Sequence, residues 1–165
     1  MREKLNCILV IDDDEPTNYL SAMLIEEADC THHLEIIQSG LTAIDYLMKA
    51  SLDGKAGNYV VPDIVFLDVN MPRMNGWEFL EEYKKIKKDS FSKTMIIMLT
   101  TSLNPDDKLR ALSMPEIAGY ERKPLSMEII TRIMNTNCKP GSVLINEEWH
   151  TRPHDANTST HTCNY

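Results

Sequence analysis

Short apolar runs alternate along this chain with longer segments whose apolar residues recur at helical spacing. Five runs have the length and the β-branched content of buried strands, at 6–11, 34–37, 63–68, 94–99 and 117–122. A helical segment follows each of them. Strands that alternate with helices predict a parallel sheet with helices on both faces. We therefore expect an α/β fold with a doubly wound, five-stranded parallel sheet in (βα)5 order.

The helical segments also show where they begin and which side they bury. Pro16 suits the first turn of the first helix, and Asn104 and Ser126 are expected to cap the last two. Spacing predicts the buried face of the first helix to consist of Leu20, Met23, Leu24 and Ala28. It predicts the buried face of the second helix to consist of Leu41, Ile44, Leu47 and Met48.

Four of the apolar runs end in residues that can carry out chemistry. These endings are Asp12-Asp13-Asp14, Asp68, Thr100-Thr101-Ser102 and Lys123-Pro124. The carboxyl ends of parallel strands meet at one edge of the sheet, where open α/β sheets bind ligands. Clustered carboxylates suit a hard divalent cation, and a hydroxyl with an ammonium suits a phosphoryl group. The sequence therefore predicts one pocket that binds both a divalent cation and a phosphoryl group.

Composition narrows the class of protein. With 165 residues, 42% of them hydrophobic and 25% charged, the chain has room for one globular domain. A net charge of −8 argues against a nucleic-acid-binding surface, and no apolar stretch has the length of a membrane span. The charged N-terminus does not resemble a signal peptide, and the four cysteines are scattered, so we expect reduced thiols and a cytoplasmic location.

The character of the chain changes near its C-terminal end. Lys139-Pro140-Gly141 breaks the last helical segment, and the residues from 151 onward are rich in Thr, Asn and His. We expect a domain over residues 1–138 and a mobile tail over residues 139–165.

The segments that end the strands resemble, in this order, the receiver domain of bacterial two-component response regulators. The segments that carry the resemblance are 8–14, 65–76, 98–102 and 120–124, within roughly residues 5–137. The resemblance is to the single-domain, chemotaxis-regulator-like members. It implies a flavodoxin-like fold for the domain at 1–138.

The resemblance assigns the phosphoryl site. It implies that Asp68 is the phosphoacceptor, a carboxylate nucleophile that forms an aspartyl phosphate. It also implies a bound Mg²⁺ (or Mn²⁺), held by the acidic pair Asp12 and Asp13 together with Asp68 and the backbone carbonyl of Asn70. Asp13 is the expected direct ligand of the pair, and Asp14 is expected to be a neighbour of the site.

Further roles come from the same resemblance. Lys123 and the Thr100 hydroxyl would each contact a phosphoryl oxygen. Thr100 and Tyr120 match the family's switch pair, in which the aromatic ring rotates from exposed to buried on phosphorylation. Pro124 matches a cis-proline. Asn70 and Ser102 occupy the positions that tune dephosphorylation, and the small Ser102 is expected to leave the water's approach open.

These expectations define a single-domain response regulator. It would accept phosphate from a histidine kinase or phosphotransfer protein and present a changed surface to an unknown downstream protein. It would not be a turnover enzyme on an external substrate, and would be a monomer or weak homodimer.

Other functions share part of this chemistry. A phosphate sink or an intermediate in a phosphorelay stays open, because it uses the same residues. A haloacid-dehalogenase-type phosphatase needs a second Asp two residues after its nucleophile, where this chain has Asn70. A flavodoxin-like cofactor binder would have a phosphate loop rich in hydroxyl residues and glycine after the first strand, and none is present.

Overall fold

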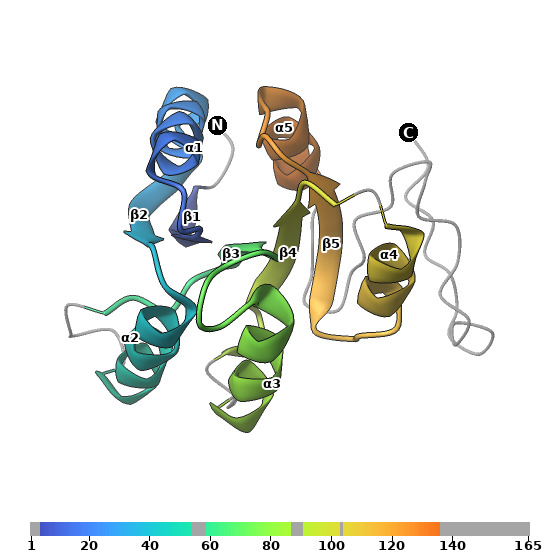
Figure 1. The fold of residues 1–165 in the computed structure, drawn as a ribbon. Coiled ribbons are helices and arrows are strands. Elements are labelled where there is room, and N and C mark those ends of the chain that lie inside the picture. The colour runs from blue at the N-terminus through green and yellow to red at the C-terminus, as the bar shows by residue number, and fades with distance from the viewer. Residues whose placement is uncertain (1–3, 54–58, 87–90, 103, 136–165) are drawn as a thin grey trace, which may run out of the picture.

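Strands and helices alternate through a computed structural model that describes residues 4–53, 59–86, 91–102 and 104–135 (Figure 1). The strands in these residues are β1 Leu5–Ile11, β2 Thr31–Ile37, β3 Ile64–Asp68, β4 Met95–Thr100 and β5 Ile117–Arg122. The helices are α1 Glu15–Ala28, α2 Gly40–Asp53, α3 Gly76–Ile86, α4 Pro105–Leu112 and α5 Met127–Asn135. The tail expected at 139–165 lies outside the described residues.

All strand pairs are parallel, and the strand order is β2-β1-β3-β4-β5. The predicted α/β fold with a doubly wound parallel sheet is therefore confirmed. The chain leaves β1 toward one edge of the sheet to form β2, then returns to the other side of β1 to form β3. This reversal places the carboxyl ends of β1 and β3 side by side, at the switch point where such sheets bind ligands.

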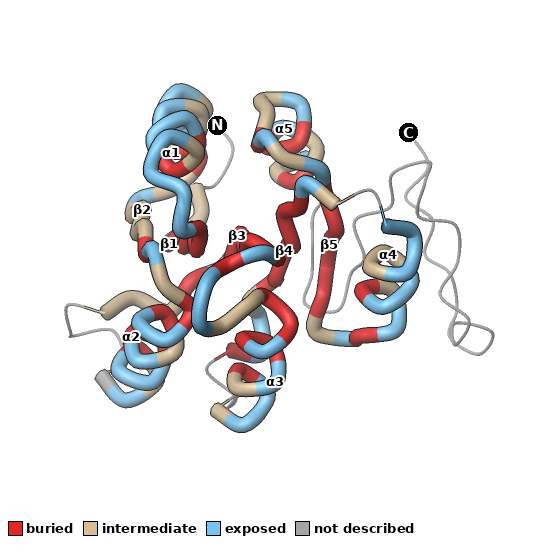
Figure 2. Tube along the Cα trace, in the orientation of Figure 1, coloured by how far each residue is buried: buried red, intermediate tan, exposed pale blue. Residues whose placement is uncertain are grey.

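Helices cover both faces of the sheet. Figure 1 shows α1 and α5 together on one face, and α2 and α3 on the other. Alternate residues of each strand supply the two apolar layers, because successive side chains point to opposite faces. Leu9 and Leu67 pack in the layer under α2 and α3, whereas Val10 and Phe66 pack in the layer under α1 and α5. Figure 2 shows β3, β4 and β5 almost wholly buried between these layers, whereas the edge strand β2 is mostly of intermediate exposure.

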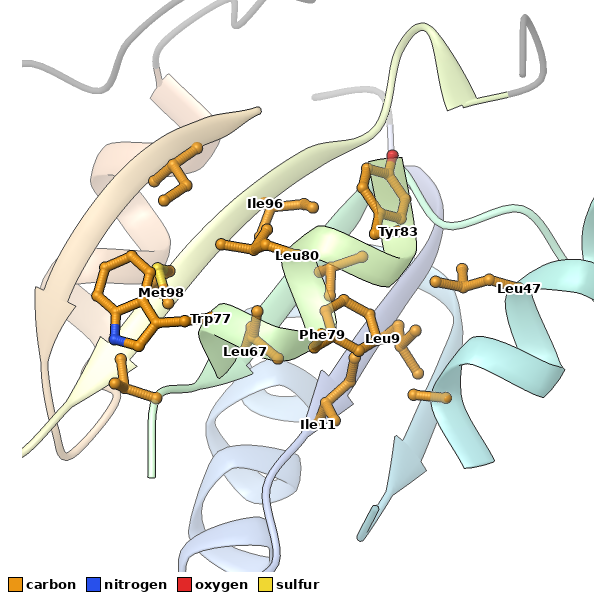
Figure 3. Packing of buried hydrophobic residues seen from close by; sticks show 14 of the residues in the cluster. Leu9, Ile11, Leu47, Leu67, Trp77, Phe79, Leu80, Tyr83, Ile96 and Met98 are labelled. Atoms are coloured by element: carbon orange, nitrogen blue, oxygen red, sulfur yellow. The ribbon is translucent and has the colours of Figure 1, made fainter. Parts of the chain in front are cut away.

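Figure 3 shows the larger layer, in which α3 contributes the labelled aromatic side chains. Trp77, Phe79, Leu80 and Tyr83 are all buried there, against strand residues such as Met98. Phe79 stacks on Tyr83 with ring centroids 6.3 Å apart. This packing fixes α3, and with it the loop that leads from Asp68 into the helix.

The predicted buried face of α1 was partly wrong. Leu20 and Met23 are 41% and 51% exposed, while Asn18, Ser21 and Ile25 are the buried residues. Two of these buried residues are polar, so a pattern that counts only apolar residues does not register them. The helix begins as expected, with Pro16 in its first turn. None of the helices in the described residues has the length and apolar character needed to cross a membrane.

The buried face of α2 is also rotated from the predicted one. Leu47 is fully buried, as predicted, but Leu41 and Met48 are 52% and 47% exposed. Ala43 and Ala50 lie in the core instead. The small alanines bring the helix backbone close to the sheet, and a pattern that counts only large apolar residues does not register them.

Adjacent residues of α2 provide a test of this orientation. Leu47→Ala should lower the free energy of unfolding by about 2–5 kcal/mol, because it leaves a cavity in the core. Met48→Ala, the matched control one residue along, should change it by less than about 0.5 kcal/mol. Urea denaturation of both variants measures this difference; equal losses would show that α2 is turned as the sequence pattern predicted.

Candidate functional site

Three carboxylates converge where β1 and β3 end. Ile11 pairs with Leu67 in the sheet, so Asp12 and Asp68, the next residue of each strand, come to the same level. Oxygen atoms from Asp12, Asp13 and Asp68 all lie within 4.8 Å of one another. Asp12 and Asp68 are buried, and Asp13 is exposed at the mouth of the cluster.

A single ammonium group is shared between two of these carboxylates. Lys123, which directly follows β5, has its Nζ 3.0 Å from Asp68 Oδ2 and 2.5 Å from Asp12 Oδ2. The Lys123 backbone N–H donates to the Thr100 carbonyl at 2.9 Å, which ties the end of β5 to the end of β4. The Lys123–Pro124 peptide bond is cis. Lys123 therefore connects the carboxyl ends of β4 and β5 to those of β1 and β3.

Charge in the cluster is only partly balanced. Burial raises the pKa of Asp68, and the neighbouring Asp12 charge adds to the rise, although Lys123 and the Asn70 N–H oppose it. Burial alone would lower the pKa of Lys123, but its hydrogen bonds to Asp12 and Asp68 outweigh burial and raise it. One buried ammonium is thus not enough to hold Asp68 at its ordinary acidity.

The turn after β1 is held in place by α1. Asp14 caps the helix by accepting from the Thr17 N–H at 2.9 Å, and its own N–H donates to Asp12 Oδ1 at 3.0 Å. Hydrogen bonds from Thr17 lower the pKa of Asp14. The amide of Asn18, buried on α1, donates to the Asp12 carbonyl at 2.8 Å. Sequence reasoning missed Asn18, because a polar residue inside a helix carries no distinctive signal.

The turn after β3 approaches Asp68 closely. The Asn70 N–H donates to Asp68 Oδ1 at 3.2 Å. A Cβ atom on Gly76 would lie 2.6 Å from the Asp68 carbonyl oxygen, so this position tolerates only glycine without movement. The Gly76 N–H donates to the Val69 carbonyl at 2.9 Å. This glycine thus lets α3 begin against the backbone of Asp68, a contact that the sequence pattern does not show.

The third side of the site comes from the end of β4. Thr100 is fully buried, and its hydroxyl accepts from the Ser102 N–H at 2.9 Å. Ser102 in turn donates its hydroxyl to Asp107 Oδ2 at 2.8 Å. The Ser102 side chain is therefore hydrogen-bonded to α4, and its expected effect on the water's path stays a prediction.

Tyr120 already lies on the buried side. Its ring is 9% exposed, although an exposed ring was expected before phosphorylation. Burial raises the pKa of the Tyr120 hydroxyl. Thr100 lies near enough to oppose this rise slightly, but the Tyr120 hydroxyl makes no hydrogen bond of ordinary geometry within the described part of the chain.

The donor set of the cluster suits a small hard cation. Its ligand atoms are carboxylate oxygens, which Mg²⁺ prefers, and one exposed carboxylate beside two buried ones leaves room for the waters that Mg²⁺ retains. The raised pKa of Asp68 shows that additional positive charge would be stabilising. Asp12, Asp13 and Asp68 therefore fit a divalent metal, next to an ammonium placed for an anion.

Comparisons with known proteins point to one family. The family model described as the response regulator receiver domain matches residues 8–135. The probable methanogenesis regulatory protein FilR2 of Methanothrix harundinacea is 30% identical over 125 residues, which cover 76% of each chain. The response regulator Rcp1 of a Synechocystis species is 30% identical over 114 residues, or 69% of each chain. A two-component response regulator structure from Cytophaga hutchinsonii is similar with a TM-score of 0.73 and 28% identity, covering 81% of this chain and 96% of that one.

The strained charge balance predicts that Asp68→Asn stabilises the metal-free protein at pH 7. A folded-state pKa raised above the ordinary value of 3.8 means that ionised Asp68 costs stability at neutral pH, and that this cost disappears as the pH falls toward 3.8. Thermal unfolding in EDTA should therefore give a higher Tm for the variant at pH 7, with a gap that narrows on acidification. A lower Tm for the variant at pH 7 would show that the ion pair with Lys123 outweighs burial.

Proposed function

The chain belongs to the response regulator receiver domain family, and from this premise we propose that it accepts a phosphoryl group on Asp68 from a histidine kinase or phosphotransfer protein. The observation that carries the proposal is the Lys123 ammonium, 3.0 Å from Asp68, beside the acidic pair. Such a group is placed to meet the negative charge of a phosphoryl oxygen. Asp12 is also buried and also contacts Lys123, so Asp68 is distinguished by its place at the end of β3, the central strand of the sheet.

In the proposed transfer, an Asp68 oxygen forms a bond to phosphorus as the bond from phosphorus to the donor's histidine nitrogen breaks. The released imidazole nitrogen takes up a proton. Lys123 and the Thr100 hydroxyl stabilise the charge on the equatorial oxygens. Asp12, Asp13, Asp68 and the Asn70 carbonyl would hold Mg²⁺ or Mn²⁺, with Asp13 as a direct ligand. When bound, the metal supplies charge neutralisation at the phosphoryl oxygens.

Hydrolysis of the aspartyl phosphate would depend on positioning rather than on a general base. Asn70 and Ser102 remain the proposed tuning residues, and neither is a strong base near neutral pH. Asn70 is exposed beside Asp68 and can hydrogen-bond an incoming water. Ser102 is small and would leave the water's approach open, while its hydroxyl donates to Asp107. This chemistry makes the chain a phosphoacceptor rather than a turnover enzyme.

Phosphorylation would change the surface formed by α4 and β5, through Thr100 and Tyr120. That surface would be read by a downstream protein, in a monomer or weak homodimer that does not bind nucleic acid. The free, buried thiols of Cys7 and Cys30 support a cytoplasmic location. We assign residues 1–138 to the receiver domain and 139–165 to a tail. A phosphate sink or relay intermediate is the alternative, because it needs the same site and no output surface.

Labelling with acetyl phosphate in Mg²⁺ tests the phosphoacceptor. Asp68→Asn should abolish the label, because an amide oxygen cannot displace the donor. Asp14→Asn, a matched change in the neighbouring helix cap, should leave labelling within about twofold of wild type because Asp14 lies outside the metal-ligand set. Full-strength labelling of the Asp68 variant would assign the chemistry to another residue.

Metal binding without phosphate tests the acidic cluster. Trp77 follows Gly76 at the start of α3 and can report Mg²⁺ binding through its fluorescence. Asp13→Ala should weaken Mg²⁺ binding by at least about tenfold because it removes a direct ligand. Asp14→Ala removes a carboxylate of the same acidic run and should have little effect. If the two variants bind Mg²⁺ equally well, the metal site lies elsewhere.

A further inference from the structure

A chain of hydrogen bonds connects the phosphoryl site to α4, and it ends at a residue with no role in the chemistry proposed above. We infer that Asp107 is a positioning residue, which acts through Ser102 to hold Thr100 in its unphosphorylated arrangement and so opposes phosphorylation of Asp68. This inference rests on the proposed function and adds to it a control from the output surface. We call the contact between Ser102 and Asp107 the latch.

The contacts that form the latch are short and continuous. The Ser102 N–H donates to Thr100 Oγ1 at 2.9 Å, and the Ser102 hydroxyl donates to Asp107 Oδ2 at 2.8 Å. The Asn104 N–H donates to the same Ser102 hydroxyl at 3.1 Å. The Ser102 side chain thus joins Thr100, which is fully buried, to the first turn of α4.

The position of α4 depends strongly on such polar contacts, because the helix buries little. Ala111 is its buried residue, and Leu109 is 63% exposed. The Arg110 guanidinium lies 4.4 Å from the Trp77 ring centroid, which adds a cation–π contact to α3. Figure 2 shows the outer side of α4 as exposed over most of its length. A short helix with so few buried contacts can shift at low cost once its polar ties are released.

The latch restricts the movement that phosphorylation requires. In the proposed function, the Thr100 hydroxyl is drawn toward a phosphoryl oxygen on Asp68. The Ser102 N–H must then follow it or lose its acceptor. Because Asp107 holds the Ser102 side chain, Ser102 can follow only if α4 moves or the latch opens. A charge-assisted hydrogen bond of this kind stabilises the arrangement that it holds.

The affinity for beryllofluoride in saturating Mg²⁺, an equilibrium mimic of the aspartyl phosphate, tests the inference. Asp107→Ala should tighten this affinity by about fivefold, the equivalent of one net hydrogen bond. Asp106→Ala is the matched control, because it removes the same charge from the same helical turn without touching the latch. Asp107→Asn keeps an acceptor for the Ser102 hydroxyl and should lie between wild type and Asp107→Ala.

Ser102→Ala completes a double-mutant cycle. It should tighten the affinity as Asp107→Ala does, and the double variant should gain no more than either single one. Equal affinities for Asp107→Ala and Asp106→Ala, or weaker binding in Asp107→Ala, would overturn the inference. If Asp107→Ala does not fold, as judged by circular dichroism, the order of wild type, Asp107→Asn and Ser102→Ala decides the question. Failure of the wild-type protein to bind beryllofluoride would instead count against the proposed function.

Discussion

The site depends on one ammonium group shared between two buried carboxylates. Lys123 lies 2.5 Å from Asp12 and 3.0 Å from Asp68, and it directly follows β5, which β4 separates from β3. Buried charges are costly unless they are paired, and here one positive charge serves two negative ones, with Asp13 nearby. The raised pKa of Asp68 is the result. A divalent metal ion would supply the missing positive charge, and the negative phosphoryl group would then be stabilised by that metal and by Lys123.

The surrounding structure keeps these charges in place. The reversal of strand order beside β1 brings Asp12 and Asp68 together, and the two apolar layers fix the strands that carry them. Gly76 lets α3 begin against the Asp68 backbone, and Asn18 holds the Asp12 carbonyl from α1. Helix α3 buries Trp77, Phe79, Leu80 and Tyr83, whereas α4 buries Ala111 and makes polar contacts through Asp107 and Arg110. The residues of the site are therefore held rigidly, whereas α4, which belongs to the surface that a partner would contact, is freer to move.

Much of this arrangement can be predicted from the sequence, for a physical reason. Buried parallel strands are continuous apolar runs, so the polar residue that ends each run is conspicuous, and Asp12, Asp68, Thr100 and Lys123 could be placed at one edge of the sheet. The helix faces were harder, because Ala43 and Ala50 approach the sheet where larger residues were expected. Asn18 and Asp107 were not found, since their roles arise from contacts between turns and helices that leave no periodic signal. The burial of Tyr120 could not be predicted either, because the rotation of a single side chain does not alter the pattern of apolar and polar residues.

The identity of the phosphorylated atom is the central claim, and chemical trapping tests it directly. Borohydride reduces an aspartyl phosphate to homoserine, which marks the modified residue permanently. Wild-type protein phosphorylated with acetyl phosphate in Mg²⁺, reduced in this way and digested, can be mapped by tandem mass spectrometry. The account predicts homoserine at position 68 alone. Homoserine at position 12 or 13, or a phosphoryl group on a histidine with Asp68 unmodified, would contradict it.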